Sequence, residues 1–252
     1  MKCTRRRKSG GILRIALLTA MHVEQDVCLD VPHRQLVFTL PKRFRLYCRY
    51  DRKLLGRMTR EAWLCVRACA REVLGRRDVV PGMVAGLQTH GELVNFHPHI
   101  HALVTCGAFT EDGTFLEIPG FDEERMLALW EERIFRLLCK KELISEDVVA
   151  QMRSWEHTGF GFDQSVHLPA GDRKGIERLV QYIVRCPFSI SRIIKVTDEG
   201  TVLYRSEKQH CRAFPDAHSP ALRQGTKRNF QILPALDFIA EFTQHIPAKG
   251  SH

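Results

Sequence analysis

Residues 97–109 read HPHIHALVTCGAF, and this stretch predicts the β-strand on which the fold depends. Side chains alternate between the two faces of a strand, so His97, His99 and His101 share one face while Ile100 enters the apolar side. Neighbours on one face are about 6 to 7 Å apart, which lets two imidazoles bind one divalent cation. The strand therefore predicts a metal site with open positions for substrate oxygens. A row of surface histidines without a ligand is the alternative.

The elements predicted around this strand indicate an α+β fold. Further strands are expected at 33–40, 83–89, 160–168, 190–197 and 201–205. Helices are expected at 52–74, 123–139, 145–155, 172–185 and 235–245, with a loop at 209–226. The strands come as hairpins, and the helices between them lack regular βαβ order. We therefore expect an antiparallel sheet with helices on one face.

Composition and charge narrow the class of protein. The chain has 252 residues, of which 44% are hydrophobic and 27% are charged, a balance typical of a globular protein. Its net charge of +9 favours polyanionic partners, of which nucleic acid is the commonest. No apolar stretch approaches the roughly 20 residues of a membrane span, so no membrane association is expected. The nine cysteines include no CxxC pair, which indicates reduced thiols in a cytosol.

A second candidate feature is the helix predicted at 172–185, DRKGIERLVQYIVR. Tyr182 lies off its apolar stripe, with Arg178 at i−4 and Arg185 at i+3. A phenol between two guanidinium groups is suited to approach a phosphodiester, because the arginines can hold the phosphate. Gly175 would leave room for a nucleic-acid strand on nearly the same face. A half-exposed tyrosine that packs on arginine stems is the alternative.

Two of these stretches match a known family. NFHPHIHALVTCGAF (95–109) and ERLVQYIVRCPFSISRI (177–193) resemble the IS91-type transposases, single-strand transposases of the HUH endonuclease superfamily. Further matching stretches extend the similarity over about residues 31–250: VPHRQLVFTLPKRFR (31–45), VLYRS (202–206), KRNFQIL (227–233) and LDFIAEFTQHIPAKG (236–250). The resemblance implies a DNA transposase.

The resemblance also implies a fold and a mechanism. The sheet would be RRM-like, in the HUH nuclease fold, and His99 and His101 would hold Mg²⁺ or Mn²⁺. Tyr182 would attack phosphorus, release a 3′ hydroxyl and form a 5′-phosphotyrosine bond to single-stranded DNA at the transposon ends and the target. Residues 31–250 would form the catalytic domain, with a helical insertion at about 122–156. Residues 1–30 would be a basic, poorly ordered segment.

Ligands and DNA contacts follow from the same comparison. The third metal ligand is expected to be His97, with Gln88 as the second choice, because the arginines beside Tyr182 stay protonated and are poor ligands. Phosphate and DNA contacts are expected from four basic residues: Arg178, Arg185, Lys227 and Arg228. The protein is expected to be cytoplasmic and associated with the nucleoid.

Three departures from the family pattern leave other functions open. The best-known members carry two tyrosines four residues apart, whereas Arg178 stands four residues before Tyr182. A single nucleophile must then be reused, or a homodimer must supply the second one. The N-terminal cysteine-rich zinc segment and the C-terminal end of the family are expected to be lacking. The alternatives are an inactive DNA-binding transposase remnant and a metal-dependent hydrolase.

Overall fold

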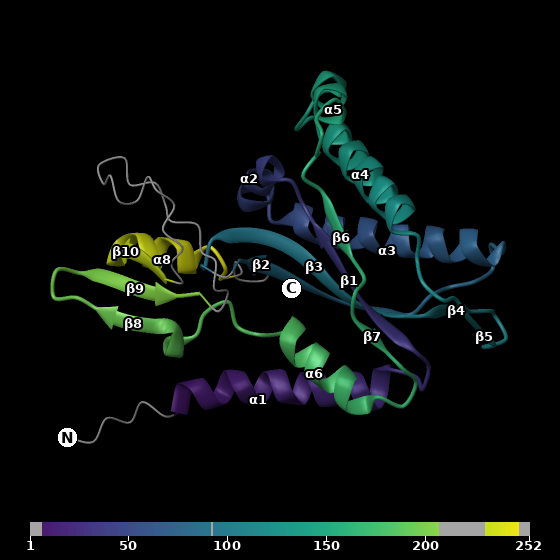
Figure 1. Cartoon of the computed structure of the whole chain (residues 1–252), viewed down its shortest axis with the longest axis horizontal. Helices are drawn as coiled ribbons and strands as arrows, with labels where there is room; N and C mark the ends of the chain where they lie inside the picture. Colours follow the sequence, from purple (N-terminus) through teal and green to yellow (C-terminus); the bar gives the residue numbers. More distant parts are fainter. Residues whose placement is uncertain (1–6, 92, 207–229, 247–252) are drawn as a thin grey trace. The chain divides into compact units, whose positions relative to one another are not determined.

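The computed structural model describes residues 7–91, 93–206 and 230–246. The chain divides into two compact units, Met1–Gln88 with Pro98–Arg185 and Thr89–His97 with Cys186–His252. Figure 1 shows mixed helices and antiparallel strands, which confirms the predicted α+β class. The predicted domain boundaries stay a prediction.

The first unit is built on a five-stranded sheet. Its strands are β1 (His33–Thr39), β2 (Met83–His90), β3 (Phe96–Thr105), β6 (Gly161–Asp163) and β7 (His167–Leu168). Their order is β2-β3-β1-β6, and β7 also pairs with β1. β1 runs antiparallel to β3, with Val37 opposite His101 and Phe38 opposite Ile100. The histidine stretch therefore forms an inner strand, with β2 and β1 as its neighbours.

The sheet face that carries Phe38 and Ile100 is covered by α4 (Glu123–Lys140). The ring of Trp130 on α4 lies 5.1 Å from the ring of Phe38, and its Nε1 donates a hydrogen bond of 2.9 Å to the carbonyl of Thr39. Phe38 and Ile100 are fully buried. Helix α3 (Lys53–Leu74) packs against α4.

The opposite face of the sheet is covered by α6 (Arg173–Ile183), so the expectation of helices on one face is wrong. Leu103 of β3 joins a cluster with the apolar stripe of α6: Ile176, Leu179, Val180 and Ile183. Side chains alternate between the two faces of a strand, and Ile100 and Leu103 are three positions apart on β3. They therefore point to opposite faces of the sheet. Both faces are apolar here, and each needs its own helix to bury it.

The N-terminal segment also differs from the expectation of poor order. Residues Arg7–His22 form the helix α1, followed by a π-helical turn at Val23–Val27. Figure 1 shows α1 beside α6, and buried Ala20 and Val23 join the α6 cluster. This packing explains why residues 7–27 are helical. None of the helices in the described ranges has both the length and the apolar character that crossing a bilayer requires.

Several predicted helices and strands are confirmed, with shifted ends. The predicted helix pair appears as α4 and α5 (Glu146–Arg153), and the predicted strand at 160–168 is divided into β6 and β7. Helix α2 (Lys42–Tyr50) was not predicted. A short hairpin consists of β4 (Gly107–Phe109) and β5 (Phe115–Glu117).

Among its described residues, the second unit contains a three-stranded antiparallel sheet of order β10-β9-β8 and the helix that follows β10. Its elements are β8 (Ile193–Val196), β9 (Thr201–Arg205), β10 (Phe230–Pro234), α8 (Ala235–Thr243) and the 3-10 turn Ile190–Arg192. Its core gathers four buried residues: Val94, Val202, Tyr204 and Phe238. The loop predicted at 209–226 lies outside the described residues.

Candidate active site

Two histidines of β3 project from the same face of the sheet, the one covered by α6. The ring centroids of His99 and His101 lie 4.7 Å apart, with the ring planes at 73°. His101 is 4% exposed, whereas His99 is partly exposed. The strand thus presents one buried and one more accessible imidazole side by side.

The environment of His101 keeps its imidazole neutral. Burial, chiefly, lowers the pKa of His101 to about 4, and the nearby charges of His99 and Arg185 lower it further. Its Nδ1 lies 2.8 Å from the side-chain nitrogen of Gln35 on β1. Its Nε2 is buried and has no hydrogen-bond partner in the described part of the chain. A neutral imidazole is the form that binds a metal ion.

Helix α6 brings a tyrosine to this histidine pair. The helix begins after Asp172, whose carboxylate accepts a 2.9 Å hydrogen bond from the backbone nitrogen of Gly175. Near the other end, the Tyr182 ring lies with its centroid 5.3 Å from that of His101, and the two planes are nearly perpendicular at 86°. Tyr182 is 42% exposed. A phenol accessible to solvent therefore lies against the buried histidine.

Arg185 adds a positive charge beside the phenol. It follows the end of α6, and its guanidinium carbon lies 4.3 Å from the centroid of the Tyr182 ring. This is a cation–π contact over the ring face. An anion that approaches the Tyr182 oxygen would also meet the field of this guanidinium group.

The histidine pair fits a divalent cation. The fit rests on the unpartnered Nε2 of His101, which is a buried nitrogen without a described donor or acceptor. Within the described ranges, no group of three or more His, Cys, Asp or Glu side chains is arranged to hold a metal. His99 and His101 would thus provide two ligands, and the remaining positions would fall to other oxygens or nitrogens.

Residues 82–252 match the family model Y2_Tnp, which is described as "Putative transposase". The chain belongs to this transposase family. It is 25% identical over 248 aligned residues to the transposase for insertion sequence element IS801 from Pseudomonas savastanoi pv. phaseolicola. The alignment covers 90% of this chain and 54% of that relative, so the chain spans about half of the relative's length. No solved structure matches.

The family match confirms the resemblance to IS91-type transposases that the histidine strand and the tyrosine helix indicate. The matched region contains β2, β3 and α6, and therefore every element of this transposase that carries His99, His101 or Tyr182.

The structure does not place the other site residues predicted for this transposase in the contact between Tyr182 and His101. Arg178 is exposed on α6, one turn before Tyr182. His97 is at the start of β3, in the part that belongs to the second unit, and its role as a ligand stays a prediction. Lys227 and Arg228 lie outside the described residues.

Gly175 does not leave room for DNA. It is buried, and a Cβ atom there would come within 2.1 Å of a carboxylate oxygen of Asp172 and 2.8 Å of Leu168. The glycine instead allows the first turn of α6 to lie close to its N-cap and to β7.

Sequence reasoning missed Gln35 and Gly86. Gln35 is a buried polar residue of β1 (HRQLVFT), and a buried polar side chain on a strand is a signal for a hydrogen-bond partner on the next strand. A Cβ atom on Gly86 would come within 2.0 Å of Ile183 Cγ2, a close approach that no local pattern reveals.

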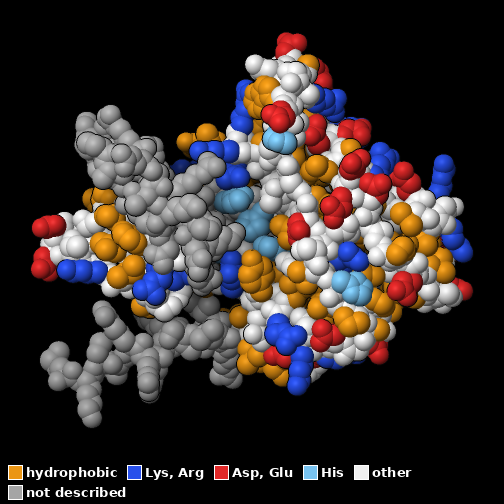
Figure 2. Space-filling view, viewed as in Figure 1, with side chains coloured by type: hydrophobic (Ala, Val, Ile, Leu, Met, Phe, Trp, Pro, Cys, Tyr) orange, Lys and Arg blue, Asp and Glu red, His pale blue; other side chains and the backbone are white. Residues whose placement is uncertain are grey.

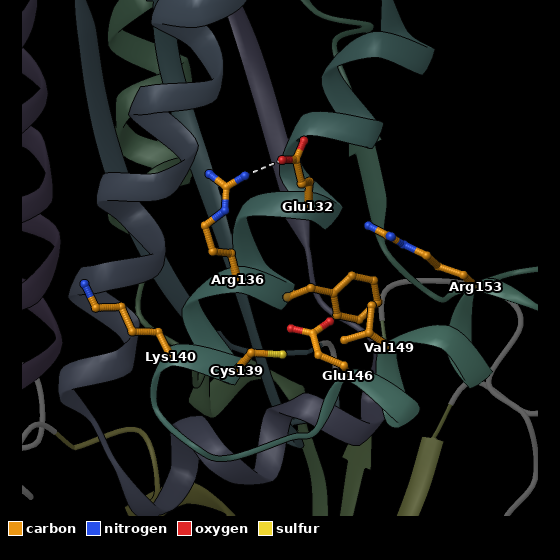
Figure 3. A pocket seen from close by; sticks show the side chains of 8 residues that line it. Glu132, Arg136, Cys139, Lys140, Glu146, Val149 and Arg153 are labelled. Carbon is orange, nitrogen blue, oxygen red and sulfur yellow. Dashed lines mark hydrogen bonds and ion pairs between the residues drawn. The ribbon is translucent and has the colours of Figure 1, made fainter.

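A separate pocket of about 360 Å³ lies between α4 and α5 (Figure 3). Its charged lining is mixed: Glu132 pairs with Arg136, and Glu146 lies beside Cys139. Arg153 from α5 lies with its guanidinium carbon 5.6 Å from the Phe135 ring. None of its lining residues comes from β3 or α6. The pocket therefore has no part in the histidine and tyrosine site.

Proposed function

We propose that this member of the transposase family nicks and rejoins single-stranded DNA through a 5′-phosphotyrosine intermediate on Tyr182. The observation that carries the proposal is the contact of the Tyr182 ring with His101, beside His99, although α6 and β3 are far apart in the sequence. The five-stranded sheet would then be the RRM-like sheet of an HUH nuclease.

The chemistry begins at the phenol. Tyr182 loses its proton, and its oxygen forms a bond to phosphorus in line with the bond to the 3′ oxygen, which breaks. The 3′ oxygen gains a proton and leaves as a hydroxyl group. The phosphodiester is retained as a 5′-phosphotyrosine, so a later 3′ hydroxyl can reverse the step and join strands without a nucleotide cofactor.

The surrounding groups bind and orient the phosphate. A divalent cation, Mg²⁺ or Mn²⁺, bound by His99 and His101 would supply the Lewis acidity that polarises the scissile phosphate. Arg185, over the Tyr182 ring, stabilises the negative charge that grows on the phosphate oxygens. Arg178, exposed one turn earlier, contacts the adjoining DNA backbone. The same Tyr182 acts on both strands in turn, or a partner protomer in a homodimer supplies the second phenol.

The test is a covalent adduct assay. The full chain is incubated with Mg²⁺ or Mn²⁺ and labelled single-stranded oligonucleotides that tile the DNA flanking its own coding sequence. A band that resists denaturation is expected for the wild type. Tyr182→Phe and His99→Ala should abolish it, whereas Tyr50→Phe, at a side chain 84% exposed on α2, should retain it.

Two other outcomes would support the other functions instead. Binding of single strands without any adduct would indicate a DNA-binding remnant without chemistry. Hydrolysis that survives Tyr182→Phe would indicate a metal-dependent hydrolase that uses the histidines and water.

A further inference from the structure

Gln88 connects the sheet to the end of the tyrosine helix. It lies on β2, beside the histidine strand, and is 3% exposed. Its side-chain nitrogen donates two hydrogen bonds, 3.0 Å to the carbonyl of Tyr182 and 2.9 Å to the carbonyl of Ile183. These are the last two residues of α6, where carbonyls run out of partners within the helix.

The orientation of this amide follows from its partners. Both partners are carbonyl oxygens, which only accept, so the NH₂ group of Gln88 must face them. The Gln88 oxygen then points away, and it is buried without a partner in the described part of the chain. The two hydrogen bonds of Gln88 therefore fix the backbone of Tyr182, although the Gln88 oxygen has no partner among the described residues.

A second contact, between Ile183 and Gly86 of β2, also fixes the last turn of α6. Gly86 lies two residues before Gln88 on the same face of β2, and its missing side chain leaves the space that Ile183 Cγ2 fills. Ile183 is itself buried in the cluster that contains Leu103. The end of α6 is therefore fixed to the sheet by close packing at Gly86 and by two hydrogen bonds at Gln88.

We propose that Gln88 is a positioning residue for strand transfer: its amide holds the last turn of α6 so that the Tyr182 phenol stays beside His101. The inference rests on the proposed role of Tyr182. It assigns Gln88 to the helix backbone, in contrast to the role of a metal ligand considered from the sequence. A shift of a reacting group by about 1 Å can slow a reaction by about 100-fold. Loss of the two Gln88 hydrogen bonds should therefore slow the formation of the covalent adduct.

The test combines a signal from the phenol with a rate. The full chain is labelled with 3-fluorotyrosine, and ¹⁹F NMR is recorded without metal or DNA. Of the four tyrosine signals, that of Tyr182 is the one missing in Tyr182→Phe. Gln88→Met removes the donor and keeps the side-chain length. The matched control is Gln181→Met, because the Gln181 side chain donates its hydrogen bond to Glu177 within α6 and not to the sheet strands that the structure describes.

Gln88→Met should move or broaden the Tyr182 signal and slow single-turnover adduct formation by about 10- to 100-fold, with unchanged Mn²⁺ affinity. Gln181→Met should change neither. If Gln88→Met does not fold, as judged by circular dichroism, Gln88→Asn, which is too short to reach both carbonyls, should displace the same signal.

Failure of this inference differs from failure of the proposed function. A wild-type chain that forms no adduct, but whose Tyr182 signal still responds to Gln88→Met, contradicts the proposed function and supports the positioning. A folded Gln88 variant with an unchanged Tyr182 signal overturns the positioning. Reduced Mn²⁺ affinity with that unchanged signal would instead make Gln88 a metal ligand.

Discussion

His99 and His101 lie on one face of one strand, yet their surroundings differ. His101 is buried and touches Gln35, whereas His99 is partly exposed. A histidine that binds a metal through Nε2 keeps its proton on Nδ1 and donates it to a neighbour, and this hydrogen bond fixes the ring. The structure places the amide nitrogen of Gln35 at Nδ1. When the amide flips, its oxygen takes that place and accepts the Nδ1 proton, so Gln35 would be such a neighbour in the metal-bound form.

Gln35→Leu should therefore weaken metal binding without unfolding the chain. Loss of the partner of Nδ1 frees the His101 ring and its tautomer, and the affinity for Mn²⁺ should fall by about 10- to 100-fold. Electron paramagnetic resonance of free Mn²⁺ measures this affinity. Gln151→Leu, at an exposed position of α5, is the control. Equal affinity in the wild type and in Gln35→Leu would exclude this role for Gln35.

The sequence predicts part of this arrangement and not the rest. Alternation in a strand places His99 and His101 together and sends Ile100 into the core, as the structure has them. The contact between Tyr182 and His101 is not local, so no periodicity could predict it; it was expected only through the family resemblance. The close approach of Ile183 to Gly86 joins a helix to a strand, and a pattern within one element does not encode it.

Helix α6 lies close to β2 at Gly86, and this packing predicts a cost for any side chain there. Gly86→Ala would place a methyl group in the space of Ile183 Cγ2, a stiff and buried β-branched side chain. The free energy of unfolding should fall by about 1 to 3 kcal/mol. Urea denaturation measures it.

Gly56→Ala in α3 is the matched control for this substitution. Gly56 is exposed, and nothing lies within 4 Å of a Cβ atom there. Alanine is the better helix former by about 0.5 to 1 kcal/mol, so the control should be at least as stable as the wild type. A Gly86→Ala chain with wild-type stability would show that α6 is not packed on β2 as described.

Elements with strong periodicity were predicted well, and those shaped by side-chain hydrogen bonds were not. The predicted apolar spacing in α3 places Leu55, Met58 and Cys65 on its buried face. The strand predicted at 160–168 breaks because Asp163 accepts a hydrogen bond from the Ser165 hydroxyl and Gln164 turns inward to the Phe121 backbone. These hydrogen bonds compete with the strand ladder.

The charge of the whole chain gives a test of DNA binding. The net charge is +9, but acidic and basic side chains are interspersed over α4 and α5 on the face shown in Figure 2. The logarithm of the affinity for single strands should fall with the logarithm of the salt concentration, with a slope of about −0.7 for each phosphate contacted. Three such contacts would lower the affinity by more than about tenfold between 50 and 200 mM salt. Fluorescence anisotropy measures it, with an uncharged methylphosphonate strand as control. A flat salt response would contradict a phosphate-binding surface.

Identification of the residue that becomes covalently bound to DNA tests the central claim most directly. The adduct is trimmed with nuclease, digested with protease and analysed by mass spectrometry. The account predicts a 5′-nucleotide on the peptide that contains Tyr182 and on no other peptide. A nucleotide on Tyr47, Tyr50 or Tyr204, or an adduct that persists in Tyr182→Phe, would contradict it.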